Sequence, residues 1–129
     1  MVKRIKKVAK PNAAQEIGKP HHIVFGFRYL HPTSYPDCNN SAFFIKFLKR
    51  LQQLSTITWE QANVADRHSF GYEKIPVEQI KSHVNLTEDV RTLVAFRATG
   101  DNHVFLGIRE ADVFQVVFIE SSFGDIYNH

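Results

Sequence analysis

Hydrophobic and polar residues alternate near both ends of the chain, and this period of two predicts strands. From His22 to Leu30 one face collects four apolar side chains, Ile23, Phe25, Phe27 and Tyr29. The same alternation predicts three further strands over residues 93–98, 103–109 and 113–120, separated by polar turns. The last of these is apolar on both faces, so we expect it at the centre of a sheet.

The residues between these stretches follow a helical period. Apolar residues recur at the spacing of one helical face, at Phe44, Phe47, Leu48 and Leu51, with Lys46, Lys49, Arg50, Gln52 and Gln53 on the other side. Thr58 and Gln61 have the spacing of a capping box, which predicts a second, shorter helix with Trp59 docked into the core. Residues 67–72 suggest a loop or short strand, and residues 77–83 suggest another short helix after Pro76.

These elements together predict an α+β domain over residues 21–129. Its small antiparallel sheet would combine the C-terminal three-strand meander with the N-terminal strand and pack against one long and one or two short helices. The 129 residues are 43% hydrophobic and 12% aromatic, which suffices for one core. Residues 1–20 have weak periodicity and many lysines, so we expect a flexible basic arm.

The turn lengths predict how the last three strands pair. Pairing of Ala98 with His103, and of Arg109 with Val113, would place one set of side chains on a single face: Leu93, Ala95, Arg97, Val104, Leu106, Ile108, Phe114, Val116, Phe118 and Glu120. The opposite face would hold Val94, Phe96, His103, Phe105, Arg109, Val117 and Ile119. A slip of one residue would exchange the faces. In this register Arg97 lies on a largely apolar face near Glu120, and His103 lies on the other face.

The positive charge of the chain is concentrated at its start. Lysine and arginine number 16 against 13 acidic residues, and five of the 16 fall within the first ten positions, so the remainder has a small negative balance. A basic arm can bind a polyanion through counterion release. The alternative is a solvated terminus that aids solubility. We assign four residues of the arm to nucleic-acid contact, Lys3, Arg4, Lys6 and Lys7.

Several function classes lack their sequence signatures here. The single cysteine, Cys38, excludes an internal disulfide and a zinc site built on cysteine pairs, and fits a reducing compartment. No apolar run is long enough to span a bilayer or to form a secretory signal, so we expect a cytoplasmic protein without a membrane partner. The glycine-rich phosphate loop, the nucleophile elbow and paired histidine ligands are also missing. We therefore expect no cofactor and no metal.

Arg97 and His103 are the residues best suited to chemistry. A guanidinium among apolar residues must be paired or must face a ligand, because a buried unpaired charge costs several kcal/mol. Arg97 is therefore either the structural partner of Glu120 or a group that grips a phosphate. His103 opens a strand beside a turn, where it would be accessible, and imidazole is the side chain most often used for acid and base work. The alternative for His103 is a solvated side chain at a loop edge.

The C-terminal stretch LVAFRATGDNHVFLGIREADVFQVVFIESSFGDIY, residues 93–127, resembles the C-terminal half of RelE/ParE-like toxins. The shared pattern is a strand ending in an arginine, two further strands, then an acidic residue and a tyrosine near the end. The resemblance implies a small antiparallel sheet against a helical pair, and cleavage of mRNA on the ribosome. It matches Arg97 to the strand arginine and Tyr127 to the terminal tyrosine. His103 stands where a second arginine is common in that group.

Three hypotheses follow, and the third is a small-molecule site in a pocket between helix and sheet, for which the sequence offers no polar signature. The first is an RNA-directed toxin-like protein acting as a metal-independent endoribonuclease, with Arg97, His103 and Tyr127 as catalytic residues. Lys74 and Arg109 would join the arm in holding the RNA backbone. Its partners would be RNA or the ribosome, and a protein such as an antitoxin. The second hypothesis is a non-catalytic binding module, in which the sheet or the Phe-rich helix meets a protein or nucleic-acid partner.

Overall fold

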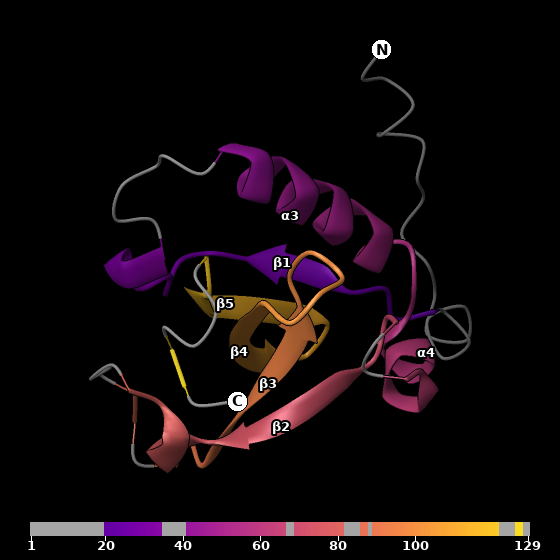
Figure 1. Ribbon diagram of the computed structural model, residues 1–129. Helices are drawn as coiled ribbons and strands as arrows, with labels where there is room; N and C mark the ends of the chain where they lie inside the picture. Colours follow the sequence, from indigo (N-terminus) through magenta and orange to yellow (C-terminus); the bar gives the residue numbers. More distant parts are fainter. Residues whose placement is uncertain are drawn as a thin grey trace, which may run out of the picture.

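The structure, a computed structural model, describes residues 20–34, 41–66, 69–81, 86–87, 89–121 and 126–127. Its strands form one five-stranded sheet in the order β1-β5-β4-β3-β2 (Figure 1). They are β1 (Val24–Gly26), β2 (Tyr72–Pro76), β3 (Thr92–Arg97), β4 (Val104–Glu110) and β5 (Val113–Ile119). The helices are α3 (Ser41–Leu54) and α4 (Trp59–Val64), with single 3-10 turns at Pro32–Ser34 and Val77–Gln79. The predicted α+β class is confirmed, and the predicted arm lies outside the described residues except for Pro20.

The sheet differs from the predicted one in two respects. It is mixed, because β1 pairs in parallel with β5 while the other neighbours are antiparallel. The long connection through α3 and α4 makes a parallel pair possible. It also has a fifth strand, β2, beyond the short segment considered at 67–72. In the predicted helix over 77–83 only Val77–Gln79 is helical, as a 3-10 turn, and residues 82–83 lie outside the described part.

The strand β1 is shorter than the alternation around it. Only Val24–Gly26 pairs with β5, although the apolar pattern extends to Tyr29. A turn follows at once, in which the N–H of Leu30 donates to the carbonyl of Phe27. The turn redirects the chain away from the sheet and ends the strand.

The helix α3 lies across one face of the sheet (Figure 1). The side of α3 that faces the sheet buries its own residues Phe43, Phe47 and Leu54. The ring centroid of Phe47 lies 5.0 Å from that of Phe105 in β4. The predicted core face was wrong at Leu48, whose side chain is 68% exposed. The helix is instead rotated so that Arg50 turns toward the sheet, where it finds backbone acceptors that the hydrophobic period alone does not reveal.

The shorter helix α4 begins as predicted. The N–H of Gln61 donates to the Thr58 hydroxyl, and the side chain of Gln61 accepts from the Thr58 N–H, which completes the capping box. Trp59 in the first turn is 2% exposed, and its ring centroid lies 6.1 Å from those of both Phe96 and Phe114. The docked tryptophan therefore joins α4 to the same core as α3.

The predicted register is right for one hairpin and off by one residue for the next. Ala98 and His103 close the β3–β4 turn, as predicted. Arg109, however, pairs with Phe114 rather than Val113, and an irregularity follows at Leu106 and Gly107. Beyond the irregularity the predicted faces of Phe118 and Glu120 are right. Up to it the predicted faces are wrong, because Phe114 and Val116 lie on the α3 side of the sheet and Val117 lies on the other side. One extra residue in a strand exchanges the two sheet faces for all the residues of that strand that come before it.

The second face of the sheet carries its own apolar cluster. Leu93, Val104, Leu106 and Phe118 are buried there. The described residues that pack against them include Ile80, Leu86, Val90, Ile126 and Tyr127. No helix among the described residues is long and apolar enough to cross a membrane.

Candidate functional site

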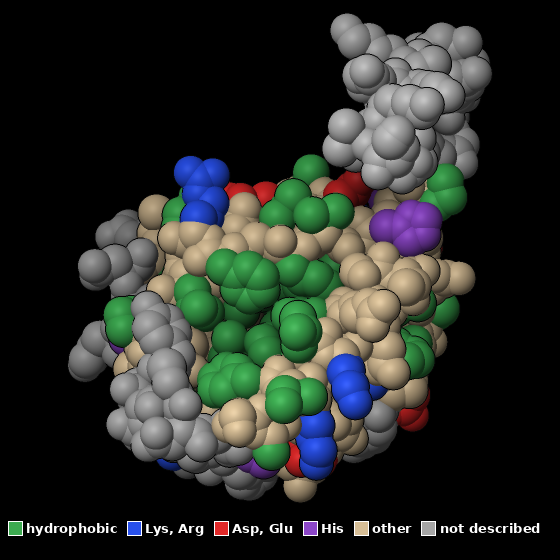
Figure 2. Space-filling model, turned by 90° about the horizontal axis from the view of Figure 1, so that it is seen from above, with side chains coloured by type: hydrophobic (Ala, Val, Ile, Leu, Met, Phe, Trp, Pro, Cys, Tyr) green, Lys and Arg blue, Asp and Glu red, His purple; other side chains and the backbone are tan. Residues whose placement is uncertain are grey.

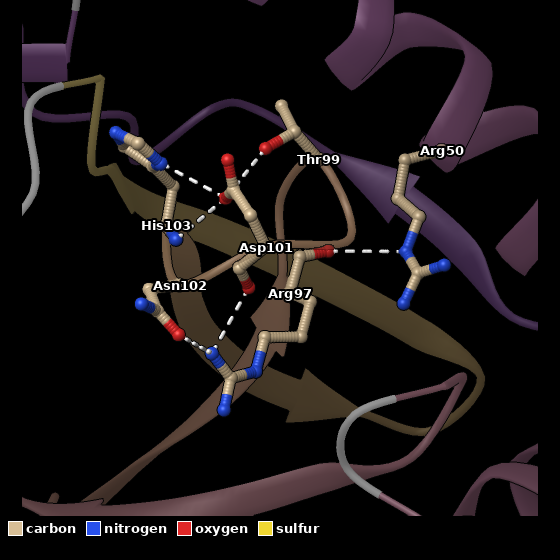
Figure 3. A network of polar contacts seen from close by, with 6 residues as sticks. All are labelled: Arg50, Arg97, Thr99, Asp101, Asn102 and His103. Atoms are coloured by element: carbon tan, nitrogen blue, oxygen red, sulfur yellow. Dashed lines mark hydrogen bonds and ion pairs between the residues drawn. The ribbon is translucent and has the colours of Figure 1, made fainter.

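The turn between β3 and β4 is organised by the Asp101 carboxylate (Figure 3). Its Oδ1 accepts hydrogen bonds from the backbone N–H of His103 at 2.9 Å and from the Thr99 hydroxyl at 2.8 Å. The Nδ1 of the His103 ring also lies 2.9 Å from this oxygen. The turn bends through Gly100, whose φ of +87° suits glycine. The side chains of the turn are therefore held in a fixed arrangement.

This arrangement changes the acidity of Asp101. Partial burial acts to raise the pKa of its carboxyl, but the hydrogen bonds from His103 and Thr99 outweigh it and lower the pKa from 3.8 to about 2. Asp101 is therefore ionised at neutral pH and attracts positive charge at this end of the sheet.

Arg97 ends β3 and packs beneath the same turn. Its Nη1 donates to the carbonyl of Asp101 at 2.9 Å and to Oδ1 of Asn102 at 3.3 Å. The residue is 8% exposed. The turn thus binds Arg97 through a backbone carbonyl and His103 through a carboxylate, on its two sides (Figure 3). Arg97 is a nearly buried cation whose orientation is set by the turn.

Two carboxylates share the sheet face of Arg97. Arg97 pairs with Val104 across the sheet, and the N–H of Glu120 donates to the carbonyl of Val104, so Arg97 and Glu120 flank Val104 in one row. Glu73 pairs with Ala95, two residues before Arg97, which puts it diagonally beside Arg97. Glu120 is fully buried, whereas Glu73 is partly exposed. The register therefore groups one cation with two acids.

Tyr127 lies on this face as well. It is buried in the same apolar cluster as Leu93 and Val104, and its backbone forms an isolated bridge with Ile80. The structure therefore places two of the three residues predicted as catalytic, Arg97 and Tyr127, on one face of the sheet.

The third, His103, lies on the opposite face. Its ring contacts that of Phe43 in α3, with 5.5 Å between the ring centroids. Arg97 and His103 are both held by the Asp101 turn, and their side chains lie on opposite faces of the sheet. This separation agrees with the register predicted from the turn lengths.

Sequence reasoning missed Arg50 and Glu73. Arg50 donates from Nε to the carbonyl of Arg97 at 3.3 Å, donates to the carbonyl of Ser69, and stacks 4.8 Å above the Phe70 ring. Burial and then the nearby charge of Arg97 lower the pKa of Arg50. A cation in an otherwise apolar helical stripe was the available signal for Arg50. For Glu73 the signal was its period-two relation to Ile75, whose side chain is buried on the face of Arg97.

Two of the cations predicted to hold nucleic acid, Lys74 and Arg109, lie within the described residues. Lys74 is exposed on the edge strand β2. Arg109 lies with its guanidinium carbon 4.3 Å from the centroid of the Trp59 ring and donates from Nε to the carbonyl of Ala111 at 2.7 Å. The arm residues Lys3, Arg4, Lys6 and Lys7 lie outside the described residues.

A separate pocket of about 460 Å³ opens on the sheet face away from α3. Ile108, Val117, Leu86 and Val90 contribute apolar walls, Arg28 and Glu110 contribute charges of opposite sign, and His31 contributes an imidazole. None of the residues assigned to catalysis lines it. Within the part of the chain that the structure describes, no group of three or more His, Cys, Asp or Glu side chains is arranged to hold a metal ion.

Comparison with known proteins gives no relative from which a function could be transferred. No protein-family model matches the chain, and no curated protein and no solved structure is detectably similar to it. The site must therefore be interpreted from its own residues.

Proposed function

We propose that the chain is an RNA-directed, toxin-like endoribonuclease whose site is the sheet face that carries Arg97. The observation that supports this most is the grouping of Arg97, Glu73, Glu120 and Tyr127 on that one face. A cation that can bind a phosphate, with a carboxylate beside it, is the minimum set for cleaving RNA by its own 2′-hydroxyl. The helices α3 and α4 ahead of the antiparallel β2–β5 strands also agree with the arrangement that the resemblance implies.

In this proposal Glu73 is the general base, because it is the partly exposed carboxylate of the two. It takes the proton of the 2′-hydroxyl, the 2′-oxygen bonds to the adjacent phosphorus, and the bond from phosphorus to the 5′-oxygen breaks. The leaving 5′-oxygen takes a proton from water, and the products carry a 2′,3′-cyclic phosphate and a 5′-hydroxyl. Arg97 stabilises the charge that develops on phosphorus.

The remaining residues orient these groups. Glu120, fully buried in the row of Arg97, holds the guanidinium in place. The phenol of Tyr127 donates to a phosphate oxygen. His103, on the opposite face, acts through the Asp101 turn and not on the phosphate. The basic residues of the arm supply salt-sensitive attraction to the RNA backbone.

Cleavage of labelled RNA in EDTA, with and without ribosomes, tests the proposal. We expect cleavage of RNA and none of the matching DNA, because DNA lacks the 2′-hydroxyl. Arg97→Gln and Glu73→Gln should each lower the rate by about 100-fold or more, the usual cost of losing one such group. Glu78→Gln, a change of the same kind at an exposed glutamate, is the matched control. An RNA that stays intact under both conditions rejects the enzyme.

A non-catalytic binding module is the second candidate, favoured by the hydrogen bonds that Arg97 makes to its own turn. Nη1 of Arg97 already has two acceptors, Asp101 and Asn102, as in a structural arginine. If this reading holds, Arg97→Ala and His103→Ala leave RNA binding intact, while deletion of residues 1–10 abolishes it. The enzyme reading requires instead that a change at Arg97 lowers the rate of RNA cleavage.

A further inference from the structure

Hydrophobic side chains are exposed on the side of the molecule that carries α3, and acidic as well as basic side chains lie near them (Figure 2). Ile45 and Leu48 of that helix are 57% and 68% exposed. An apolar surface with scattered charges of both signs selects no particular partner. The pocket of about 460 Å³ on the other face of the sheet is more selective, because it is concave and the strand register fixes where its polar groups lie.

The floor of this pocket is apolar. Ile108 of β4 and Val117 of β5 line it from the sheet, and Leu86 and Val90 line it from the segment between β2 and β3. All four belong to the apolar cluster on this face or pack against it. Sites for small molecules have volumes of about 300–1,000 Å³ and mostly apolar walls. The pocket therefore suits the apolar body of a small molecule.

Two oxygen acceptors lie close together at one end of the pocket. Gln115 pairs with Ile108 across the sheet, and Glu110 follows Ile108 by two residues, so the two side chains are diagonal neighbours on one face, about 7–8 Å apart. Gln115 is 7% exposed, and its Oε1 accepts no hydrogen bond within the part of the chain that the structure describes. The carboxylate of Glu110 lines the pocket and has no partner among the described residues. Because a buried acceptor without a donor destabilises a fold, this pair favours a ligand that brings N–H donors and positive charge.

The turn after β1 brings donors to the pocket. The guanidinium carbon of Arg28 lies 5.1 Å from the centroid of the Tyr29 ring, and this side chain has no ion-paired partner in the described part of the chain. The Nδ1 of His31 accepts the N–H of Thr33 at 3.2 Å, so the neutral ring carries its proton on Nε2, which can donate. Arg28 and His31 both line the pocket. This part of the pocket favours a ligand that brings a carboxylate.

The strand register separates the acceptors from the donors. The N–H of His31 donates to the carbonyl of Val117, whereas Glu110 pairs with Val113. Val113 and Val117 are four residues apart along β5, which corresponds to about 13 Å. An extended tripeptide spans about 10 Å between its ends, and the side chains of the pocket reach inward over the remainder. A ligand that uses both ends of the pocket must therefore be elongated.

We propose that this pocket binds a small apolar molecule with an ammonium group at one end and a carboxylate at the other, the chemistry of a short apolar peptide with free ends. The ammonium group donates to Glu110 and, after rotation of the side-chain amide, to Oε1 of Gln115. The carboxylate accepts from Arg28 and from Nε2 of His31, and the apolar body lies on the floor between them. This site is separate from the proposed site of RNA cleavage, because no residue assigned to cleavage lines the pocket.

Isothermal titration calorimetry of the full chain with the peptide Leu-Ala-Leu tests the pocket. Acetylation of the amine or amidation of the carboxylate should each weaken binding by about tenfold or more, the usual effect of removing a charged hydrogen-bonding group. Gly-Gly-Gly has the same ends without apolar side chains, and it should also bind about tenfold or more weakly. Leucine alone should bind more weakly than Leu-Ala-Leu, because its two charges share one carbon and cannot reach both ends of the pocket.

Variants that remove one charge assign each end of the ligand. Glu110→Gln should bind the free and the acetylated peptide equally, and Arg28→Gln should bind the free and the amidated peptide equally. Glu60→Gln on α4 and Lys49→Gln on α3 are matched controls at exposed charges, and both should keep the two preferences of the native chain. Urea unfolding checks that each variant is folded.

Three results would each overturn the proposal. The first is that Leu-Ala-Leu does not bind the native chain at millimolar concentration. The second is that the peptide blocked at both ends binds as well as the free one. The third is that Glu110→Gln or Arg28→Gln, while folded, keeps the preference that it should lose. RNA cleavage is measured separately, so its absence leaves these three outcomes unchanged.

Discussion

Asp101 and His103 are held together twice, since one oxygen of the carboxylate accepts the backbone N–H of His103 and also lies 2.9 Å from its ring Nδ1. The contact closes the β3–β4 turn and, through the carbonyl of Asp101, fixes Arg97. The low pKa of Asp101, about 2, follows from it.

The first prediction concerns acid stability. Because the pKa of Asp101 is lower in the folded chain than its ordinary 3.8, the carboxylate stabilises the fold above about pH 4 and loses this effect as the pH falls toward 2. Its side chain is 61% exposed, so solvent screening limits the effect to about 1 kcal/mol or less. Urea unfolding from pH 5 to pH 2 should show the native chain losing its advantage over Asp101→Asn. A difference between the two that is constant with pH would contradict this.

The second prediction is that Arg97 and Glu120 are energetically coupled. Removing one partner of a buried ion pair leaves the other charge uncompensated, so Arg97→Met and Glu120→Gln should each destabilise the chain by about 3 kcal/mol or more. The double variant should cost less than the two single changes added together, by about 1 kcal/mol or more. The four free energies of unfolding in urea, of the native chain, the two single variants and the double variant, give the coupling. If the stability losses of the two single variants simply add in the double variant, Arg97 and Glu120 do not interact, although they lie in one row across the sheet.

The third prediction separates two reasons for glycine. A Cβ on Gly107 would overlap the carbonyl of Gln115, so Gly107→Ala should destabilise the chain by about 2 kcal/mol or more. A Cβ on Gly100 meets no atom within 4 Å, but the φ of +87° strains other residues. Gly100→Ala should therefore cost about 1 kcal/mol, and Gly100→Asn less, because asparagine tolerates positive φ. Thermal unfolding of the three variants checks the order. Equal losses for Gly107→Ala and Gly100→Ala would refute the steric explanation.

The fourth prediction assigns Arg109 to the fold. Its guanidinium lies over the Trp59 ring, and the indole Nε1 of Trp59 donates to the carbonyl of Asp112 at 2.9 Å. Arg109→Gln should lower stability by about 1 kcal/mol, in the range of a partly exposed cation–π contact. The fluorescence of Trp59, the single tryptophan, follows unfolding. RNA affinity should remain within about twofold of the native value, a change typical of a cation that makes no phosphate contact. A larger loss of affinity with unchanged stability would assign Arg109 to the RNA instead.

Local signals in the sequence were enough for much of the fold. The capping box at Thr58, the docking of Trp59 and the pairing of Ala98 with His103 depend on neighbouring residues, and each was predictable. The strand β2 was not, because Tyr72–Pro76 is short and mixes polar with apolar residues. The irregularity near Gly107 was also hidden, since its cause is the close approach of the β5 backbone.

The candidate site was predictable only in part. The separation of Arg97 from His103 followed from the length of one turn and the period of two. Glu120 was placed on the face of Arg97 correctly only because the irregularity at Leu106 and Gly107 cancels the one-residue error in the predicted β4–β5 pairing. Glu73 comes to Arg97 through β2, which is distant along the chain, and no local pattern joins them. The rotation of α3 that exposes Leu48 depends on backbone acceptors for Arg50. Hydrophobic periodicity along the sequence does not reveal such tertiary contacts.

The parallel pairing of β1 with β5 has a consequence for synthesis on the ribosome. The strand β1 is made first among the described strands, and its partner is made last. Until β5 leaves the exit tunnel, the apolar residues Ile23 and Phe25 have no sheet to join, so the nascent chain must hold them without their final contacts. Contacts between such distant residues slow folding and prolong the exposure of apolar surface.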